Sequence, residues 1–158
     1  MVIETKCVTF VSVNSQLPIA LHILGYLTAC GGESATSEAM AKSYGTSPVV
    51  LRRVLTKLQR AGLVETRRGA KGGCVLARDA HTMTLRHAYE ALDAEPHLLA
   101  RNPGSGGRIE GVLAEFMNDV MGEAESALLA QLEAVTIADM DRRVRSALSA
   151  HALSSLRH

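Results

Sequence analysis

Residues 47–78, SPVVLRRVLTKLQRAGLVETRRGAKGGCVLAR, decide the fold of this chain. Ser47 and Pro48 are typical of a helix start, because a serine oxygen caps free N–H groups and proline already has a helical φ angle. Apolar residues then recur every three or four positions and form one stripe, which consists of Val50, Leu51, Val54, Leu55 and Leu58. Gly62 closes the pattern, because glycine adopts the left-handed conformation at a helix end without steric cost. We therefore predict a helix over 48–61.

A β-hairpin is predicted directly after this helix, over residues 63–78. Both halves of that segment suit strands, and the glycines within 69–73 suit the turn between them. A short helix over 38–44 and a turn at Gly45 precede the 48–61 helix, which completes a helix-turn-helix with the hairpin as its wing. In that arrangement the second helix enters the major groove of DNA, while the wing contacts the backbone or the minor groove.

Positive charge is concentrated in this part of the chain. The whole sequence is nearly neutral, with a formal net charge of +1, and between Lys42 and Arg78 the only acidic residue is Glu65. A solvated helix face would also carry such charge, but the order of cap, helix, glycine and basic hairpin favours duplex DNA as the partner. The basic residues of this interval are Lys42, Arg52, Arg53, Lys57, Arg60, Arg67, Arg68, Lys71 and Arg78.

Composition bounds the fold class and the compartment. Hydrophobic residues make up 47% of the chain but aromatic residues only 3%, which suits a core of aliphatic side chains between helices. Cys7, Cys30 and Cys74 share no metal-binding spacing and cannot all pair within one chain, so we expect a reducing, cytoplasmic environment. The apolar run at 17–29 is too short to span a membrane. We predict a mainly α protein with a small β-hairpin and no membrane segment.

No arrangement of residues typical of catalysis is present. The sequence shows no nucleophile–base pair, no phosphate-binding loop and no metal-ligand spacing, so we predict that the chain is not an enzyme. His22 has no histidine or cysteine at ligand spacing and is interpreted as a partly buried helix residue. The alternative to DNA binding is a winged-helix module that docks a partner protein instead of DNA.

A long amphipathic helix is predicted over 108–134. A small domain cannot cover so long an apolar stripe, so we expect homodimer formation through this helix. Folding back onto its own domain is the alternative, because the preceding segment is rich in glycine. The apolar seam consists of Ile109, Val112, Leu113, Phe116, Met117, Val120, Met121, Ala124, Leu128 and Leu132.

The predicted organisation follows from these elements. A winged helix-turn-helix domain occupies 14–94, a linker 95–107, and dimerisation helices 108–148. The last of these helices is expected to begin after a Thr136 cap and to end near residue 148. The remaining segments are an N-terminal arm at 1–13, which either docks on a partner subunit or is loose, and a frayed tail at 149–158.

From about residue 14 to residue 140 the chain resembles the Rrf-two family of bacterial winged helix-turn-helix transcriptional regulators. The similarity is carried by NSQLPIALHILGYL at 14–27, by SPVVLRRVLTKLQRAGLVETRRGAKGG at 47–73 and by TLRHAYEALD at 84–93. The resemblance implies a homodimer that crosses its long helices and binds partly palindromic operators, usually as a repressor. The first two segments look most like the cluster-free, YwnA-like branch of the family.

The resemblance also implies which residues meet DNA. Arginine pairs bidentately with guanine or holds phosphate, so the adjacent Arg52 and Arg53, where other members carry Glu and Gln, imply a different operator. Lys57 is also predicted to contact DNA, because it is a basic residue of the same helix. Arg68 matches the wing arginine that family members place at the minor groove, and Arg67 and Lys71 flank it. The residues that match the groove-facing positions are Ser47, Val49, Val50, Arg52 and Arg53.

The segment before the predicted dimer helix differs from that of the cluster-binding members of the family, because it lacks their cysteine ligands. Those members hold an iron–sulfur cluster with three cysteines between the helix after the wing and the dimer helix. The corresponding interval here, 95–108, contains no cysteine, and His97 alone does not replace thiolate ligands. We therefore predict no cofactor and no metal. Cys30 and Cys74 are possible redox thiols, although buried or incidental thiols are the favoured interpretation.

Overall fold

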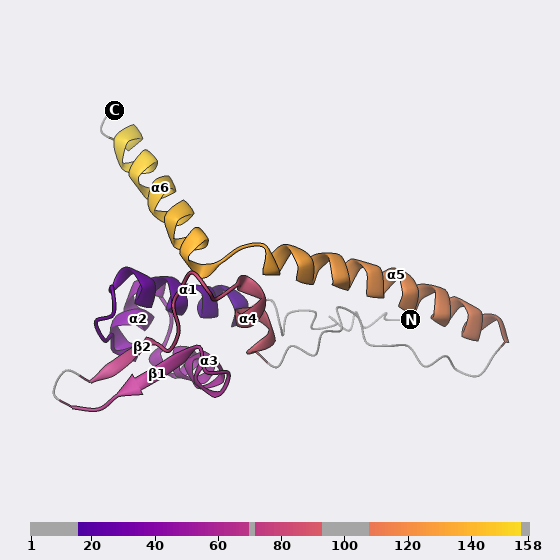
Figure 1. Cartoon of the computed structure of the whole chain (residues 1–158), viewed down its shortest axis with the longest axis horizontal. Coiled ribbons are helices and arrows are strands. Elements are labelled where there is room, and N and C mark those ends of the chain that lie inside the picture. Colours follow the sequence, from indigo (N-terminus) through magenta and orange to yellow (C-terminus); the bar gives the residue numbers. More distant parts are fainter. Residues whose placement is uncertain (1–15, 70–71, 93–107, 156–158) are drawn as a thin grey trace, which may run out of the picture.

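The structure is a computed structural model that describes residues 16–69, 72–92 and 108–155 (Figure 1). The described chain is mainly α-helical with one β-hairpin, which confirms the predicted fold class. The predicted arm, the predicted linker at 95–107 and Lys71 lie outside the described residues. The elements are α1 (Gln16–Ala29), α2 (Ser37–Tyr44), α3 (Pro48–Arg60), β1 (Val64–Arg67), β2 (Gly73–Leu76), α4 (Leu85–Glu90), α5 (Arg108–Glu133) and α6 (Ile137–Ser155).

Helices α2 and α3 form the helix-turn-helix. Thr36 caps α2, and Gly45 ends it with a φ of 77°, a left-handed conformation that favours glycine. The Ser47 oxygen accepts a hydrogen bond from the Val50 N–H at 3.3 Å and so caps α3. Gly62 follows α3 with a φ of 67°. Both ends of α3 therefore lie where the sequence predicted them.

One aliphatic core joins the helix-turn-helix to the rest of the domain. Four residues of the predicted stripe of α3 face this core, namely Leu51, Val54, Leu55 and Leu58, but the expectation for Val50 is wrong, because its side chain is 42% exposed. Helix α1 buries one side against the same core. The first residue of α6, Ile137, is fully buried there as well, so the predicted dimerisation segment 108–148 also contributes to the winged domain. The largest fully buried side chains are Ile23, Leu24, Leu27, Met40, Leu51, Leu58, Leu63, Met83, Ile137, Val54 and Val75.

Hydrogen bonds on both sides fix the root of the wing. Strands β1 and β2 pair antiparallel, with Thr66 opposite Cys74. The Cys74 N–H donates to the Ala35 carbonyl at 2.8 Å, and the Ala35 N–H donates to the Cys74 carbonyl at 2.9 Å. On the other strand, Gln59 Nε2 of α3 donates to Thr66 Oγ1 at 2.5 Å. The direction of the hairpin is thus set relative to both α2 and α3.

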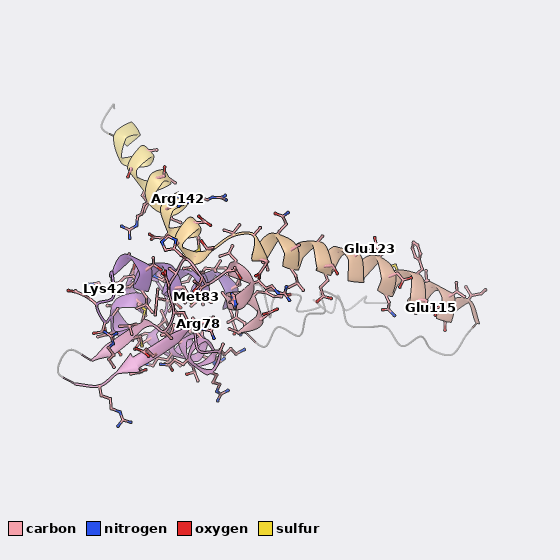
Figure 2. All side chains as sticks on the ribbon, viewed as in Figure 1. Lys42, Arg78, Met83, Glu115, Glu123 and Arg142 are labelled. Carbon is pink, nitrogen blue, oxygen red and sulfur yellow. The ribbon has the colours of Figure 1, made fainter. Side chains whose placement is uncertain are left out.

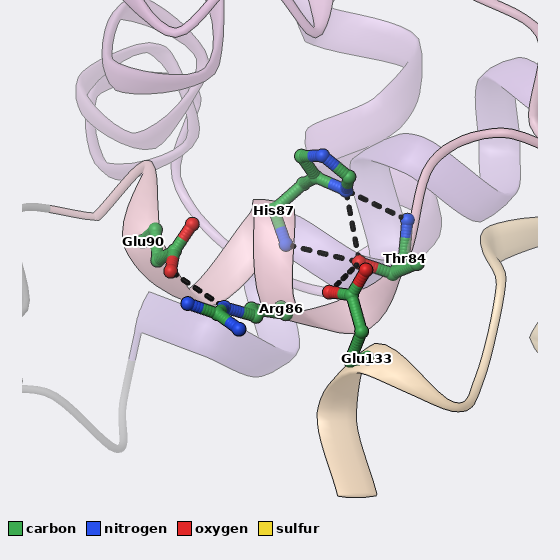
Figure 3. Close-up of polar contacts among 5 residues, drawn as sticks. All are labelled: Thr84, Arg86, His87, Glu90 and Glu133. Carbon is green, nitrogen blue, oxygen red and sulfur yellow. Dashed lines mark hydrogen bonds and ion pairs between the residues drawn. The ribbon is translucent and has the colours of Figure 1, made fainter. Parts of the chain in front are cut away.

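A polar junction connects α4 to the end of α5 (Figure 3). Thr84 and His87 form a capping box, in which the Thr84 N–H donates to His87 Nδ1 at 3.0 Å. The Thr84 hydroxyl also donates to the Glu133 carboxylate at 3.1 Å. Just beyond, the Ile137 N–H donates to the Met83 carbonyl at 2.7 Å. These bonds anchor the turn between α5 and α6 to the winged domain.

Helix α5 projects away from the winged domain, and its C-terminal end lies beside α4 (Figure 1). The side chains of its first turns remain open, with Ile109 85% exposed and Phe116 61% exposed. The alternative in which this helix folds back over its own domain is therefore wrong for the described structure. An uncovered apolar face is left along the projecting half.

Helix α6 is longer than predicted. It begins after the Thr136 cap as expected, since the Asp139 N–H donates to Thr136 Oγ1 at 3.0 Å. It then continues to Ser155, so the expectation of a frayed tail at 149–158 is wrong up to that residue. The segment after Thr136 contains no glycine or proline and several alanines, which have the highest helix propensity. Within the described ranges, none of the helices combines the length and apolar character needed to cross a bilayer.

Candidate nucleic-acid interface

The first two turns of α3 present an outward face that the core does not use. Val49 is 66% exposed and Val50 is 42% exposed, although both are large apolar residues. Arg53 lies exposed one turn further on, and it forms no ion pair with the part of the chain that the structure describes. Ser47 sits at the start of this face, with its oxygen engaged in capping the helix. The face thus combines apolar contacts with a free positive charge.

Arg52 is held by the neighbouring helix α2. Its Nε donates to Ser37 Oγ at 3.1 Å, and its Nη2 forms an ion pair with Glu38. A backbone hydrogen bond and the Arg52 guanidinium lower the pKa of the Glu38 carboxyl, so Glu38 is ionised at neutral pH. Reasoning from the sequence missed this contact, because an acid in the first turn of a helix is equally explained by the helix dipole.

Lys57 lies away from the outward face of α3. It is half-buried, and its Nζ donates to the Leu92 carbonyl at 2.8 Å beyond the end of α4. The structure therefore does not bring Lys57 together with Val49 and Arg53. The positive charge of Lys57 nevertheless lies on the same winged domain as Val49 and Arg53.

The two arginines of the wing have different surroundings. Arg67 Nη1 donates to the Gly32 carbonyl at 3.4 Å, and its Nε lies 3.7 Å from the Glu65 carboxylate. Arg68 is exposed and makes no hydrogen bond or ion pair with the described residues. It directly precedes the turn at Gly69, where φ is 124°. Arg68 is thus the freer of the two predicted wing cations.

The winged domain and the projecting helix α5 differ in the charges that they carry. In Figure 2, Lys42 and Arg78 lie on the winged domain, whereas Glu115 and Glu123 lie on the projecting α5. Two carboxylates nevertheless lie beside basic residues of α3 and the wing, Glu38 at Arg52 and Glu65 at Arg67. Because Glu65 is the only acidic residue between Lys42 and Arg78, this part of the chain still carries an excess of positive charge.

The cysteines have the surroundings of structural residues. Cys74 is buried in β2, and burial raises the pKa of its thiol, with a partial offset from a hydrogen bond to Thr66. Because the thiolate is the reactive form, Cys74 is poorly suited to rapid oxidation. Cys30 is half-buried at the end of α1. A redox role for either thiol stays a prediction.

Comparison with known proteins decides the family. The model of the Rrf2 family, described as an iron-dependent transcriptional regulator, matches residues 13–143. The chain belongs to this family. It is therefore a transcriptional regulator and not an enzyme, and the resemblance seen in the sequence is confirmed.

Relatives of this regulator carry the same description. YwnA of Bacillus subtilis, named as an HTH-type transcriptional regulator, is 32% identical over 73% of this chain and 90% of its own length. IscR of Cereibacter sphaeroides, also an HTH-type transcriptional regulator, is 30% identical over 69% of this chain and 70% of its own.

Solved structures show the fold. A transcriptional regulator from Lactobacillus plantarum has a TM-score of 0.69 at 22% identity, covering 89% of this chain and 97% of its own. The IscR of T. potens has a TM-score of 0.63 at 20% identity. The match covers 86% of this chain and 88% of the IscR chain. Both likenesses extend over the winged domain and beyond it.

The iron in the family's description does not fit the donors of this regulator. Thiolates are the usual ligands of iron–sulfur clusters, and the whole chain has three cysteines. Cys74 lies buried in the wing strand and Cys30 at the end of α1, while the interval 95–108 has no cysteine. Among the described residues, no group of His, Cys, Asp or Glu is arranged to hold a metal ion.

Proposed function

We propose that this regulator is a homodimeric repressor that binds partly palindromic operators in the cytoplasm. The observation that carries the proposal is the outward face of α3, with Val49, Val50 and Arg53 exposed at the capped end of the second helix of a helix-turn-helix. In proteins of this architecture, the N-terminal residues of that helix contact base edges in the major groove. A dimer covering the operator would then exclude polymerase from the promoter.

Each exposed side chain has a chemical partner on DNA. Valine side chains contact thymine methyl groups, and a free arginine pairs with guanine or neutralises a phosphate. Arg68 suits the minor groove, whose negative potential attracts arginine. Arg67 and Lys71 flank it and add charge near the backbone. Lys57 donates a hydrogen bond to the Leu92 carbonyl, so we propose that it attracts DNA through its positive charge and not through a direct contact.

The uncovered face of α5 supports the homodimer. Its apolar side chains recur at three- and four-residue steps, the spacing at which two helices interlock. A second copy is the occupant we propose, because a twofold interface brings two identical apolar faces together. The two α3 helices would then reach successive turns of the major groove, about 34 Å apart. The exposed members of this face are Ile109, Val112, Leu113, Phe116, Met117 and Val120.

Removing the free arginines should weaken DNA binding while the fold is kept. We expect Arg53→Ala and Arg68→Ala each to lower operator affinity roughly ten- to a hundred-fold, because each removes one direct contact per subunit. Each lost phosphate contact should also flatten the log–log salt dependence by about 0.9. Fluorescence anisotropy of a labelled operator at several salt concentrations measures both quantities.

Arg143→Ala is the matched control for this experiment. It removes the same charge from an exposed position on α6, which lies on the far side of the domain from α3 and the wing (Figure 1). We expect it to bind as the parent does. Equal operator affinity of the parent, Arg53→Ala and Arg68→Ala would contradict the proposed interface. Salt-insensitive binding of a partner protein, with no DNA retained, would instead support the winged-helix interaction module.

A further inference from the structure

Arg52 is the arginine on the helix-turn-helix whose charge is already neutralised within the domain. Its Nε is bonded to Ser37 Oγ at 3.1 Å and its Nη2 to Glu38, and Ser37 Oγ in turn donates to the second carboxylate oxygen of Glu38 at 3.2 Å. All three residues are exposed or half-buried at the surface shared by α2 and α3. One edge of the guanidinium is therefore occupied by α2.

Stability alone does not account for a carboxylate at this place. The side chains of Arg52 and Glu38 are 55% and 58% exposed, and ion pairs with such exposure contribute little to the free energy of unfolding. A carboxylate beside the second turn of α3 also repels the phosphates of a bound duplex. The pair therefore opposes general DNA affinity. Glu38 also favours the N-terminus of α2, and its effect on DNA binding beyond that lies in how Arg52 is oriented.

The geometry leaves the other edge of the guanidinium free. The Nη1 group makes no hydrogen bond to the residues that the structure describes, and one N–H of Nη2 remains beyond the bond to Glu38. Guanine offers O6 and N7 in the major groove, which accept two parallel N–H groups of one arginine. The Nη1–Nη2 edge of Arg52 supplies that pair of donors.

We propose that Ser37 and Glu38 hold Arg52 as a pre-oriented reader of guanine, and that Glu38 is a specificity-determining residue of the operator contact. The inference rests on the proposed function, since it requires α3 to lie in the major groove. Because the Arg52–Glu38 pair is neutral as a whole, it gains little from phosphate and depends on the correct base. Arg53 and Arg68, in contrast, supply charge without a restraint from a neighbouring carboxylate.

Two variants of Glu38 separate charge from orientation. Glu38→Ala removes both, so Arg52 becomes a mobile cation. We expect a steeper salt dependence, by up to about 0.9 in log–log slope, and tighter binding to unrelated DNA. Discrimination against a guanine substitution in the operator should fall roughly ten- to a hundred-fold. Glu38→Gln keeps an oxygen that accepts from Arg52, so it should steepen the slope while retaining most of the discrimination.

Arg52 itself gives the complementary result. Removing the whole pair in the Glu38→Ala, Arg52→Ala double variant should abolish the preference for guanine at that base pair yet leave the salt slope close to that of the parent, because a neutral pair releases few counterions. Arg53→Ala should flatten the slope in the same assay. Glu90→Gln is the matched control, since it neutralises the carboxylate of another exposed ion pair, with Arg86 at 2.7 Å on α4.

The test is anisotropy across a salt series. It uses the full-length protein, the operator recovered from enriched genomic fragments, its single guanine substitutions and an unrelated duplex. A Glu38→Ala protein with the parent's salt slope and guanine preference, in an assay where Arg53→Ala weakens binding, overturns this inference alone. A parent that retains no duplex DNA overturns both the inference and the proposed function. A Glu38→Ala protein that loses guanine preference and gains unrelated DNA supports the inference.

Discussion

Phe116→Glu is expected to convert the regulator into a monomer and to weaken operator binding by about 100- to 10,000-fold. Phe116 is 61% exposed in the middle of the apolar face of α5. In a twofold interface, each glutamate would lie in an apolar contact close to its symmetry copy, so desolvation and repulsion both act against association. Losing the partner removes the second half-site contact, and linked contacts of this kind raise affinity by about 100- to 10,000-fold.

Gly111→Glu is the control for that change. It introduces the same charge on the same helix, at an exposed position where an added Cβ atom meets nothing within 4 Å. It should leave a dimer that binds the operator. Light scattering during size-exclusion chromatography gives the subunit number, and anisotropy gives the affinity. A Phe116→Glu protein that remains dimeric would show that α5 does not form the interface through this face.

Gly73→Ala is expected to displace the wing. A Cβ atom at Gly73 would lie 2.7 Å from the Ala35 carbonyl oxygen, which is backbone and cannot rotate away. The double hydrogen bond between Ala35 and Cys74 must then open or shift. We expect the free energy of unfolding to fall by about 1–3 kcal/mol, as for other overpacked sites. With Arg68 moved from its position, operator affinity should fall roughly ten-fold or more.

Gly122→Ala is the matched substitution for the wing variant. An added Cβ atom there meets nothing within 4 Å, and alanine favours a helix over glycine by about 1 kcal/mol. It should therefore be at least as stable as the parent. Denaturant unfolding measures the difference between the two variants. A Gly73→Ala protein with the parent's stability and operator affinity would mean that the wing root tolerates the shift.

The sequence predicted the fold wherever local chemistry determined the structure. The ends of α3 follow from the Ser47 cap and the Gly62 stop, and its buried stripe follows from apolar spacing. The length of α6 was underestimated, because helix ends without a glycine or proline leave no local signal. The burial of Ile137 was missed for another reason: it depends on the path of the chain after α5, which periodicity does not report.

The candidate site was predictable in its outline but not in its contacts. The exposure of Val49 and Arg53 follows from their positions off the apolar stripe of α3, whereas Val50 belongs to the predicted stripe and is nevertheless 42% exposed. The restraint of Arg52 by Glu38 depends on how α2 is rotated against α3, a tertiary quantity that no single-sequence pattern contains. For the same reason, the bond from Lys57 to the Leu92 carbonyl could not be inferred from charge.

Hydroxyl-radical footprinting of the parent protein on its enriched operator tests the central claim most directly. The account predicts two protected patches on one face of the duplex, related by a dyad and centred about 10 base pairs or a multiple of that apart. It also predicts that both patches disappear together in Phe116→Glu at concentrations that saturate the parent. A single asymmetric patch, or no protection by a protein shown to be folded, would contradict the account.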